Sequence, residues 1–407
     1  MNVWLITIGE ILPIKEGARK GRTSHLADAL VERGHRVLWW TSAFDHFKKE
    51  WISNKDTTVN LDKNFEIRMM RGLGYKENFS FKRFLDHKLL AIKFKKLLKS
   101  QEKPDIIVAS LPSYELAYQA VIFANKNKIP IVIDVRDEWP DIFFEFFPRW
   151  MHFIVKIVLW RDFQIVKKCF QKCTHITSMS ESTLEWALLI GNRSKTLEDK
   201  VFYLGAKKIS ASLGAAQKFS YVERAVKKKF VVVFVGNFNE FYNPIILIET
   251  AKILSGLDIH FILGGDGVYY KKAEKQSDGF KNITLTGWLS EQEIAFILSL
   301  SHMGVIPCSR KIKAFPNKAF TYFSAGLPIV SSVEGELKEI IEKNNMGFYY
   351  PANNAVELAD KIKNIYENDD LYKKMSENVN EVFNNILDAG KIYQQYAEYL
   401  EHITKWK

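Results

Sequence analysis

The fold is decided by residues 316–332, which read Pro316-Asn317-Lys318-Ala319-Phe320-Thr321-Tyr322-Phe323-Ser324-Ala325-Gly326-Leu327-Pro328-Ile329-Val330-Ser331-Ser332. The pattern predicts a short helix that begins near Asn317, ends before Gly326 and Pro328, and leads into a strand rich in β-branched residues. Free N–H groups and the dipole at a helix N-terminus attract negative charge, and Lys318 adds a cation there. This stretch therefore predicts a site for an anionic ligand such as a diphosphate.

Length and composition favour a soluble protein of two domains. A chain of 407 residues exceeds one ordinary core, and its 47% hydrophobic and 26% charged residues are typical of a well-packed protein. The chain has three cysteines, Cys169, Cys173 and Cys308. Their odd number does not suit the disulfide framework of a secreted protein, and no second pair of metal ligands is present, so we expect free reduced thiols. We also expect a cytoplasmic location, because the N-terminus resembles a buried strand and no run of about 18 apolar residues predicts a membrane span.

Charge is unevenly distributed along the chain. Residues 1–229 contain 40 Lys and Arg against 25 Asp and Glu, a net charge of +15, whereas residues 230–407 have a net charge of −4. This asymmetry indicates an anionic partner for the first half alone. Nucleic acid is disfavoured, because no recognisable reader motif is present and the aromatic residues occur in blocks. An anionic lipid surface is the partner we expect.

Two stretches favour contact with a membrane. Residues 81–99 predict an amphipathic helix with a cationic face, and residues 143–156 combine aromatic rings with interleaved bases. Each Lys or Arg near anionic lipid contributes about 1 kcal/mol, and aromatic rings settle at the membrane interface. The alternative is that both stretches pack in the core while their lysines face water. On the membrane hypothesis, the basic N-terminal domain holds the protein on the inner face of the plasma membrane.

Short apolar runs alternate with helix-length amphipathic segments throughout, which indicates parallel strands in βαβ units. The predicted strands are 3–8, 37–41, 106–109, 131–135 and 175–178 in the first half and 230–235, 259–263, 283–286, 303–306 and 329–332 in the second. The polar, lysine-rich segment between the halves reads as a connection. The sequence thus predicts an α/β fold with one Rossmann-like domain over residues 1–208, a linker over 209–229 and a second domain over 230–385.

Glycines follow the predicted strands at the positions where doubly wound domains bind ligands, beyond the carboxyl ends of the strands. Residues 17–22 open a helix after the first strand, Gly236 follows the first strand of the second half, and Gly264–Gly267 follow the next. None of these matches a dinucleotide or P-loop spacing, and alone each glycine is typical of a turn. Their joint placement in both halves predicts a ligand cleft.

Several separate segments carry a resemblance to a known family. They are 21–37, 41–49, 134–140, 175–180, 236–237, 264–267, 286–289 and 316–336. These segments resemble GT-B glycosyltransferases, specifically the retaining enzymes of glycosyltransferase family 4, and two of them (41–49 and 134–140) resemble a subgroup that builds bacterial surface polysaccharides such as capsule and lipopolysaccharide. The resemblance implies two Rossmann-like domains that face each other across a cleft, with the acceptor in the first domain and the nucleotide-sugar in the second. It also implies that a C-terminal helix over residues 386–407 crosses back to the first domain.

The resemblance and the glycine pattern together give a set of candidate donor-binding residues: Gly21, Arg22, Gly236, Asn237, Gly265, Asp266, Gly267, Trp288, Asn317, Thr321 and Glu336. Lys318 and Arg310 are the candidate catalytic cations, because they flank the predicted helix start and a diphosphate leaving group needs positive charge. Asp137, at a strand end, is the candidate that orients an acceptor hydroxyl. The alternative role of Asp137 is to pair with Arg136 or to cap a turn. The alternative role of Glu336 is to supply negative charge at a helix N-terminus.

The chain departs from the family pattern at several positions. Family 4 enzymes normally carry a Glu-x7-Glu pair, but Lys313 and Thr321 stand at those positions here. A threonine offers one hydroxyl where a carboxylate accepts from two ribose hydroxyls. Asn237 and Tyr242 replace the usual Arg and Lys that follow the first strand of the second domain. No Asp-x-Asp motif is present, so we expect no metal and no cofactor besides the nucleotide-sugar substrate.

The resemblance implies a hexosyltransferase that moves a sugar from a nucleotide donor, expected to be a UDP-sugar, to a lipid-linked saccharide. Two alternatives stay open because of the departures. One is a catalytically silent GT-B subunit that binds or stabilises a partner glycosyltransferase. The other is a sugar-nucleotide epimerase of the same fold.

Overall fold

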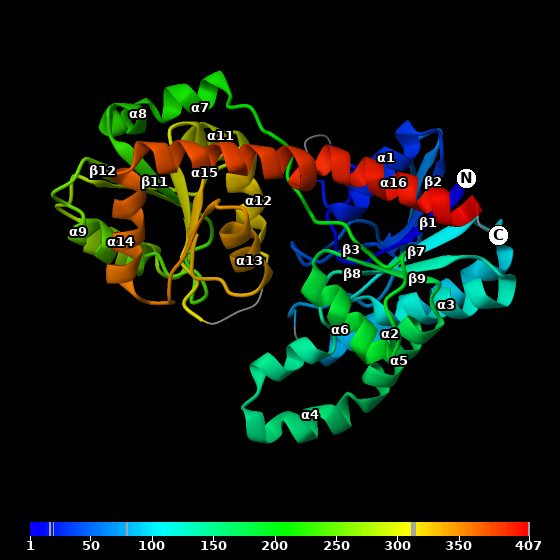
Figure 1. The fold of residues 1–407 in the computed structure, drawn as a ribbon. Coiled ribbons are helices and arrows are strands. Elements are labelled where there is room, and N and C mark those ends of the chain that lie inside the picture. The colour runs from blue at the N-terminus through cyan, green and yellow to red at the C-terminus, as the bar shows by residue number, and fades with distance from the viewer. Residues whose placement is uncertain (16–17, 19, 79, 311–314, 406–407) are drawn as a thin grey trace. The chain divides into compact units, whose positions relative to one another are not determined.

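The computed structural model describes residues 1–15, 18, 20–78, 80–310 and 315–405 (Figure 1). The chain divides into two compact units, one made of Met1–Tyr203 with Ile392–Lys407 and the other of Leu204–Lys391. Each unit has one large sheet with helices between most of its successive strands. The sheet of the first unit is parallel apart from one edge strand, and the sheet of the second unit is parallel throughout. The predicted fold class of two Rossmann-like α/β domains is confirmed.

The sheet of the first unit has the strand order β10-β9-β8-β7-β1-β2-β6-β5. Its strands are β1 (Asn2–Ile6), β2 (Arg36–Ser42), β5 (Thr57–Asp62), β6 (Phe65–Met70), β7 (Ile106–Ser110), β8 (Ile131–Val135), β9 (His175–Ser178) and β10 (Lys200–Val201). Strands β7 and β8 are buried at every position, as expected for short apolar runs covered by helices on both faces. A separate hairpin is formed by β3 (Phe44–Asp45) and β4 (Glu50–Trp51).

Strands β5, β6 and β10 of this sheet were not predicted. Strand β5 pairs antiparallel with β6 at the sheet edge. Burial along β5 alternates between half-buried and exposed positions, because one of its faces meets water. This polar alternation lacks the apolar run on which the other strand predictions rested.

Helices connect and cover the strands of the first unit. They are α1 (Arg22–Glu32), α2 (Phe81–Leu97), η1 (Leu98–Ser100), α3 (Tyr114–Asn127), η2 (Asp141–Phe146), η3 (Arg149–Met151), α4 (His152–Val158), α5 (Trp160–Lys172) and α6 (Glu181–Gly191). Helix α3 packs against α2 and α5, and its buried alanines belong to the main core of this unit. Cys169 and Cys173 lie in the same core as free thiols, as predicted.

The second unit has a six-stranded parallel sheet with the order β13-β12-β11-β14-β15-β16. The strands are β11 (Phe230–Val235), β12 (Ile259–Gly264), β13 (Ile283–Gly287), β14 (Met303–Ile306), β15 (Ile329–Ser331) and β16 (Gly347–Tyr349). Chain order runs outward from β11 to β13 and then returns to β14 on the other side of β11. The boundary between β11 and β14 is therefore the topological switch point, where such sheets bind ligands.

The helices of the second unit include two in the segment that was predicted as a linker. They are α7 (Leu213–Lys218), α8 (Ser220–Val226), α9 (Ile245–Ile253), α10 (Tyr270–Ser277), α11 (Glu291–Ser299), α12 (Asn317–Ser324), α13 (Glu336–Lys343), α14 (Ala355–Tyr366), α15 (Asp369–Val382) and η4 (Phe383–Leu387). Ser212 accepts a hydrogen bond from the Ala215 amide at the start of α7, and Phe219 and Val222 are buried. Residues 209–229 thus include packed helices that belong to the second unit.

The last helix, α16 (Ala389–Lys405), contributes most of its length to the first unit. The Tyr396 hydroxyl on α16 lies 2.6 Å from the Thr177 hydroxyl of β9. Arg33, after α1, forms an ion pair with Glu401 on α16 at 2.8 Å. These contacts fix the end of the chain to the first unit.

Candidate donor site and an aromatic surface

The candidate donor residues of the second unit gather at the carboxyl ends of its strands. Gly236 follows β11, Gly265–Gly267 follow β12 and Trp288 follows β13. Arg310 lies beyond β14, and Glu336 begins α13 beyond β15. Because all five strands are parallel, these residues lie along one edge of the sheet.

Three glycine-containing loops at this edge are joined through their backbones. The Gly236 amide donates to the Gly264 carbonyl at 2.9 Å, and the Gly265 amide donates to the Gly287 carbonyl at 2.8 Å. Gly265 has φ +145°, and a Cβ at this position would clash with the Gly236 carbonyl oxygen. Glycine is therefore required at residue 265 for the loops to approach so closely.

Asn237 and Asp266 continue the same arrangement. The Phe238 amide donates to the Asp266 carbonyl at 2.9 Å, and the Asp266 carboxylate accepts from the Gly267 amide at 2.7 Å. A Cβ on Gly267 would meet the side-chain oxygen of Asn237. The Asp266 carboxylate thus shapes its own loop.

Helix α12 is fixed against β11 and β14 by Tyr322. The Tyr322 hydroxyl accepts a hydrogen bond from the Val235 amide at 2.8 Å, and the ring fills the space above Gly304. The first turn of α12 is thereby held at the switch point between β11 and β14, as expected for a helix N-terminus that binds an anion.

Lys318 occupies the centre of this edge. Its ammonium nitrogen lies 3.7 Å from the centroid of the Tyr242 ring and 5.1 Å from that of Phe234. No carboxylate forms an ion pair with Lys318 among the residues that the structure describes. Burial lowers the pKa of Lys318 from 10.5 to about 8, while the nearby Cys308 opposes the shift. A partly buried cation without a counter-ion is a suitable partner for a diphosphate.

Arg310 has a different environment from Lys318. Its guanidinium pairs with Glu240 and lies 5.2 Å from the centroid of the Phe241 ring. Both members of this ion pair are exposed, so its contribution to stability is small. The hypothesis that Arg310 neutralises the leaving group therefore requires Glu240 to release it. Glu240 was not identified from the sequence, where no pattern marks it.

The remaining candidate donor residues of this unit lie in α12, at the start of α13 or in the loop after β13. Asn317 is the first residue of α12 and is exposed, and the Thr321 hydroxyl donates to the Asn317 carbonyl at 3.3 Å. Trp288 has 72% of its surface exposed. Glu336 is the first residue of α13, after Gly335 at φ +75°. Lys313 lies outside the described residues.

Arg22 requires a correction. It is 3% exposed, and its guanidinium donates to Asp134 at 2.8 and 3.0 Å and to the Phe202 carbonyl at 2.6 Å. Because these partners occupy the guanidinium inside the first unit, the prediction that Arg22 binds the donor is wrong. Gly21 precedes α1 and leaves room for the carboxylate of Glu10, which accepts from the Thr23 amide at 3.1 Å. The chain itself thus supplies the anion at this helix N-terminus.

Asp137 lies beyond the carboxyl end of β8 in the first unit and is exposed. Its pKa is raised by partial burial of the carboxyl group, against the opposing charges of Arg136 and Arg83. Arg136 itself pairs with Glu10 and with Asp134 at 3.0 Å. The alternative role of Asp137 as the ion-pair partner of Arg136 is therefore not what the structure shows.

An exposed apolar surface covers the end of η2, η3, α4 and the start of α5. We call it the aromatic band, and its members are Phe146, Trp150, Phe153, Ile154, Ile157, Val158 and Trp160. Arg149, Lys156 and Arg161 are exposed within the same stretch. Within residues 143–156 most side chains are exposed and only Phe143 and Val155 are buried, so the alternative that this stretch packs in the core is wrong. No helix in the described part of the chain is both long and apolar enough to cross a membrane.

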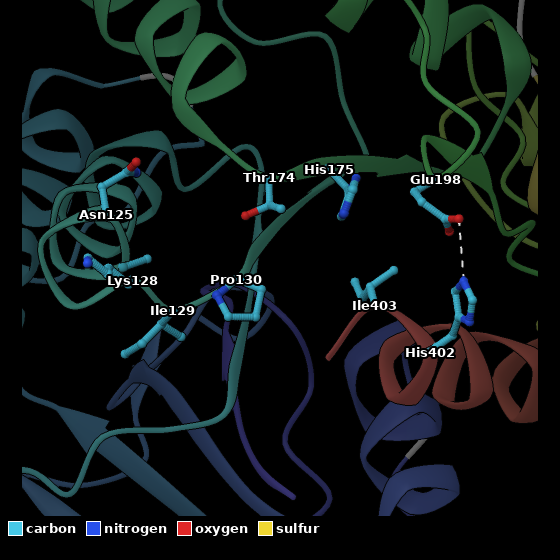
Figure 2. A pocket seen from close by; sticks show the side chains of 10 residues that line it. Asn125, Lys128, Ile129, Pro130, Thr174, His175, Glu198, His402 and Ile403 are labelled. Atoms are coloured by element: carbon cyan, nitrogen blue, oxygen red, sulfur yellow. Dashed lines mark ion pairs between the residues drawn. The ribbon is translucent and has the colours of Figure 1, made fainter. Parts of the chain in front are cut away.

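Two open grooves lie elsewhere. One of about 710 Å³ lies at the amino ends of β8 and β9 beside α16, where Figure 2 shows the ion pair between Glu198 and His402 at 3.5 Å. The other, of about 740 Å³, lies at the amino end of β11 beside Lys227–Lys229. Both are at the opposite ends of the strands from the candidate residues, so neither is the predicted donor site.

Two family descriptions match the chain, one in each half. Residues 22–196 match Glycosyltransferase Family 4, and residues 216–382 match Glycosyl transferases group 1.

Curated relatives match parts of the chain. An uncharacterized glycosyltransferase of Methanocaldococcus jannaschii is 27% identical over 174 residues, which cover 41% of this chain and 48% of that protein. O-antigen chain mannosyltransferase C of Escherichia coli is 22% identical over 183 residues, 45% of this chain and 49% of that protein. The matched region spans about half the length of these relatives or less.

Solved structures match the chain along its whole length. The Anabaena protein HepE in complex with UDP has a TM-score of 0.68 at 16% identity, covering 99% of this chain and 100% of that one. Sucrose-phosphate synthase from Thermosynechococcus elongatus has a TM-score of 0.70 at 14% identity, covering 100% of both chains. At such identities the likeness shows the fold, which is GT-B as predicted. With the two family matches covering most of its length, the chain belongs to the glycosyltransferases of the family 4 type.

Proposed function

We propose that this protein transfers a hexose from a UDP-sugar to a lipid-linked saccharide. The observation that carries the proposal is Lys318, a partly buried cation on the first turn of α12 at the switch point of the second unit. The Anabaena neighbour was solved in complex with UDP and with UDP-glucose, which supports UDP as the nucleotide.

The chemistry of the donor follows from this arrangement. Cleavage of the sugar–phosphate bond increases the negative charge on the diphosphate, and Lys318 together with the amides at the start of α12 stabilises that charge. Gly236 and Gly265 shape this site, because a Cβ on Gly236 would meet the Lys318 ammonium and a Cβ on Gly265 would meet the Gly236 carbonyl oxygen. Trp288 and the loop after β13 hold the base. On this scheme the reaction needs no metal ion.

The acceptor side belongs to the first unit. The transfer retains the configuration of the sugar, and the leaving diphosphate takes the proton of the acceptor hydroxyl on the same face. The protein therefore needs no strong base. Asp137, exposed beyond β8 with a raised pKa, orients that hydroxyl.

The aromatic band supports a lipid partner. Its seven exposed apolar side chains form a surface that a soluble protein rarely leaves uncovered, and the bases among them match an anionic lipid surface. We place the protein on the inner face of the plasma membrane through this band. The Escherichia coli relative is an O-antigen chain mannosyltransferase, which supports a role in the synthesis of a bacterial surface polysaccharide.

The silent subunit is the second candidate, and Thr321 favours it. The Thr321 hydroxyl donates to the Asn317 carbonyl within α12, so the chain offers no carboxylate for the ribose at this position. Such a protein would bind the nucleotide through Lys318 without catalysing transfer.

Incubation of the purified protein with a panel of UDP-sugars and a lipid diphosphate-linked saccharide separates these functions. Transfer that is lost in Lys318→Ala, restored in part in Lys318→Arg and unchanged in Lys275→Ala supports the proposal, because Lys275 is an exposed lysine on α10. UDP binding without turnover would instead establish the silent subunit. Conversion of the donor to an isomer without an acceptor would establish the epimerase.

A further inference from the structure

A group of cationic side chains at the carboxyl edge of the first unit has no part in the site described above. Lys49 lies between β3 and β4, and Arg83 lies in the first turn of α2. Between them are His46, which follows β3, and Tyr75, which lies in the loop after β6. We call these four residues the Arg83 cluster.

The buried ring of Tyr75 holds the cluster together. Its hydroxyl lies 2.7 Å from Nδ1 of His46. The Lys49 ammonium lies 5.0 Å and the Arg83 guanidinium 5.6 Å from the centroid of the Tyr75 ring. Arg83 also lies 4.7 Å from the centroid of the Trp139 ring. Two cations are therefore fixed around one aromatic ring.

The charges of Lys49 and Arg83 are not balanced by ion pairs. Lys49 contacts the side-chain oxygen of Asn78, Arg83 donates to the Asn78 carbonyl at 2.7 Å, and neither pairs with a carboxylate in the described ranges. The pKa of Lys49 is lowered, first by burial and then by the charge of Arg83. The Nε atom of Arg83 is buried without a hydrogen-bond partner among the described residues. Positive charge is thus concentrated here at an energetic cost.

Three carboxylates lie near these cations. Asp45 accepts from the amides of Phe47 and Lys48 at 2.8 and 2.9 Å, and Asp86 accepts from the Leu73 and Gly74 amides at 2.5 and 3.0 Å. Burial raises the pKa of Asp137 and the charge of Arg83 opposes this shift, but the two residues form no ion pair in the described structure. Two of the three are held by the backbone, so they leave the guanidinium and the ammonium available to an outside anion.

An apolar surface begins directly beside the cluster. Phe84, the residue after Arg83, lies 5.7 Å from Phe143 and 6.5 Å from Trp139, centroid to centroid. The exposed side of α2 continues this surface as a stripe of Phe81, Leu85, Leu89 and Ile92. The spacing of four, four and three residues places these side chains on one face of the helix. A cationic pair at the head of an exposed apolar stripe matches a molecule with an anionic head and a hydrocarbon tail.

We propose that Lys49 and Arg83 bind the phosphate or diphosphate group of a lipid, with its hydrocarbon chain along the α2 stripe. This deepens the proposed function, on which it rests for the identity of the lipid as the acceptor carrier. The guanidinium fork of Arg83 suits two phosphate oxygens, while Lys49 supplies a point charge. Trp139 and Phe84 lie at the boundary between the head group and the chain.

Binding of farnesyl diphosphate to the full-length protein tests the site, with inorganic pyrophosphate and farnesol as separate arms. Lys49→Gln and Arg83→Gln should each raise the dissociation constant for farnesyl diphosphate about tenfold or more, because each removes a charge-assisted contact. Lys48→Gln and Lys82→Gln are matched controls, since both lysines are exposed neighbours in sequence, and they should leave binding unchanged. Pyrophosphate and farnesol should each bind more weakly than the whole molecule.

The inference is overturned if Lys49→Gln binds farnesyl diphosphate as the unmodified protein does, or if pyrophosphate alone binds equally well. Lys49→Gln decides the question by itself if Arg83→Gln fails to fold. Lys318→Ala should leave farnesyl diphosphate binding intact, and Lys49→Gln should leave UDP binding intact. If the unmodified protein neither binds UDP nor transfers a sugar, the proposed function fails, while binding of farnesyl diphosphate still tests the lipid site separately.

Discussion

The ammonium nitrogen of Lys318 lies 3.7 Å from the centroid of the Tyr242 ring. Tyr242 follows β11 and Lys318 follows β14, so the contact joins the two sides of the switch point. The Tyr242 ring contacts a cation that forms no ion pair among the described residues, whereas the other two candidate cations of the donor site, Arg310 and Arg22, are each paired with a carboxylate. The ring buries the ammonium and contributes to its lowered pKa of about 8. An aromatic face also attracts a cation, which keeps Lys318 in place when no anion is bound.

The affinity for UDP should depend on the charge of Lys318. Below about pH 8 the ammonium is protonated and attracts the diphosphate, and as pH rises through this pKa the charge and the affinity are lost. Titration calorimetry of UDP between about pH 7 and 9.5 measures this loss. Lys318→Arg should remove the pH dependence because a guanidinium stays charged, and Lys318→Ala should bind weakly at every pH. Equal pH profiles for the unmodified protein and Lys318→Ala would contradict the role of Lys318.

The same residue should limit stability. Its folded pKa is lower than that of a lysine in the unfolded chain, so folding disfavours the charged form, and the free energy of unfolding should rise between about pH 8 and 10.5. Lys318→Met should therefore be more stable at pH 7, by on the order of 1–3 kcal/mol, while binding UDP poorly. Urea denaturation measures the change, with Lys275→Met on the exposed face of α10 as the control. A destabilised Lys318→Met would show that the contact with Tyr242 outweighs the cost of burial.

The parallel core and the position of α12 were predictable, because runs such as 106–109, 230–235 and 303–306 contain no charged or hydroxyl side chain and are bounded by helix signals. The partners of charged side chains in ion pairs were not predictable. Arg22 follows a glycine-rich loop as a ligand-binding residue would, yet it ion-pairs with Asp134, 112 positions away. The exposure of the aromatic band was likewise undecided, because the same residues suit a core or an interface. Sequence pattern identifies elements, but tertiary contacts decide which charges remain available.

The buried ion pair between Arg22 and Asp134 should be essential for the first unit. Both side chains are almost fully buried, so Asp134→Asn leaves a guanidinium without its counter-ion and should cost about 3–5 kcal/mol. The double variant Arg22→Met with Asp134→Leu should recover part of this loss, because it removes the unpaired guanidinium of residue 22 while Arg136 keeps its pair with Glu10. Urea unfolding followed by far-UV circular dichroism compares the three proteins. If Asp134→Asn unfolds at the same urea concentration as the unmodified protein, Arg22 would be neutralised by other groups.

Gly265→Ala should damage the donor site through the backbone. Its Cβ would clash with the Gly236 carbonyl oxygen, and φ +145° is a conformation that alanine avoids, so we expect a loss of about 2 kcal/mol or more in stability. UDP affinity should fall with it, because the loops after β11 and β12 must separate. Gly256→Ala is the matched control, since a Cβ there meets no atom within 4 Å and no positive φ is required. A Gly265→Ala protein with normal stability and UDP affinity would show that these loops tolerate separation.

Membrane binding should depend on the aromatic band. Trp150 and Phe153 are 75% and 73% exposed, and moving two such rings from water into the interface should strengthen binding about tenfold or more. Trp150→Ser with Phe153→Ser should therefore release the protein from vesicles that contain anionic phospholipid, as measured by co-sedimentation. Leu197→Ser with Leu213→Ser is the control, because these leucines are at least as exposed but lie outside the band. Because the bases of the band supply the electrostatic part of the attraction, salt should weaken binding of the unmodified protein without abolishing it. Equal sedimentation of the two double variants would mean that the aromatic band meets another protein instead of lipid.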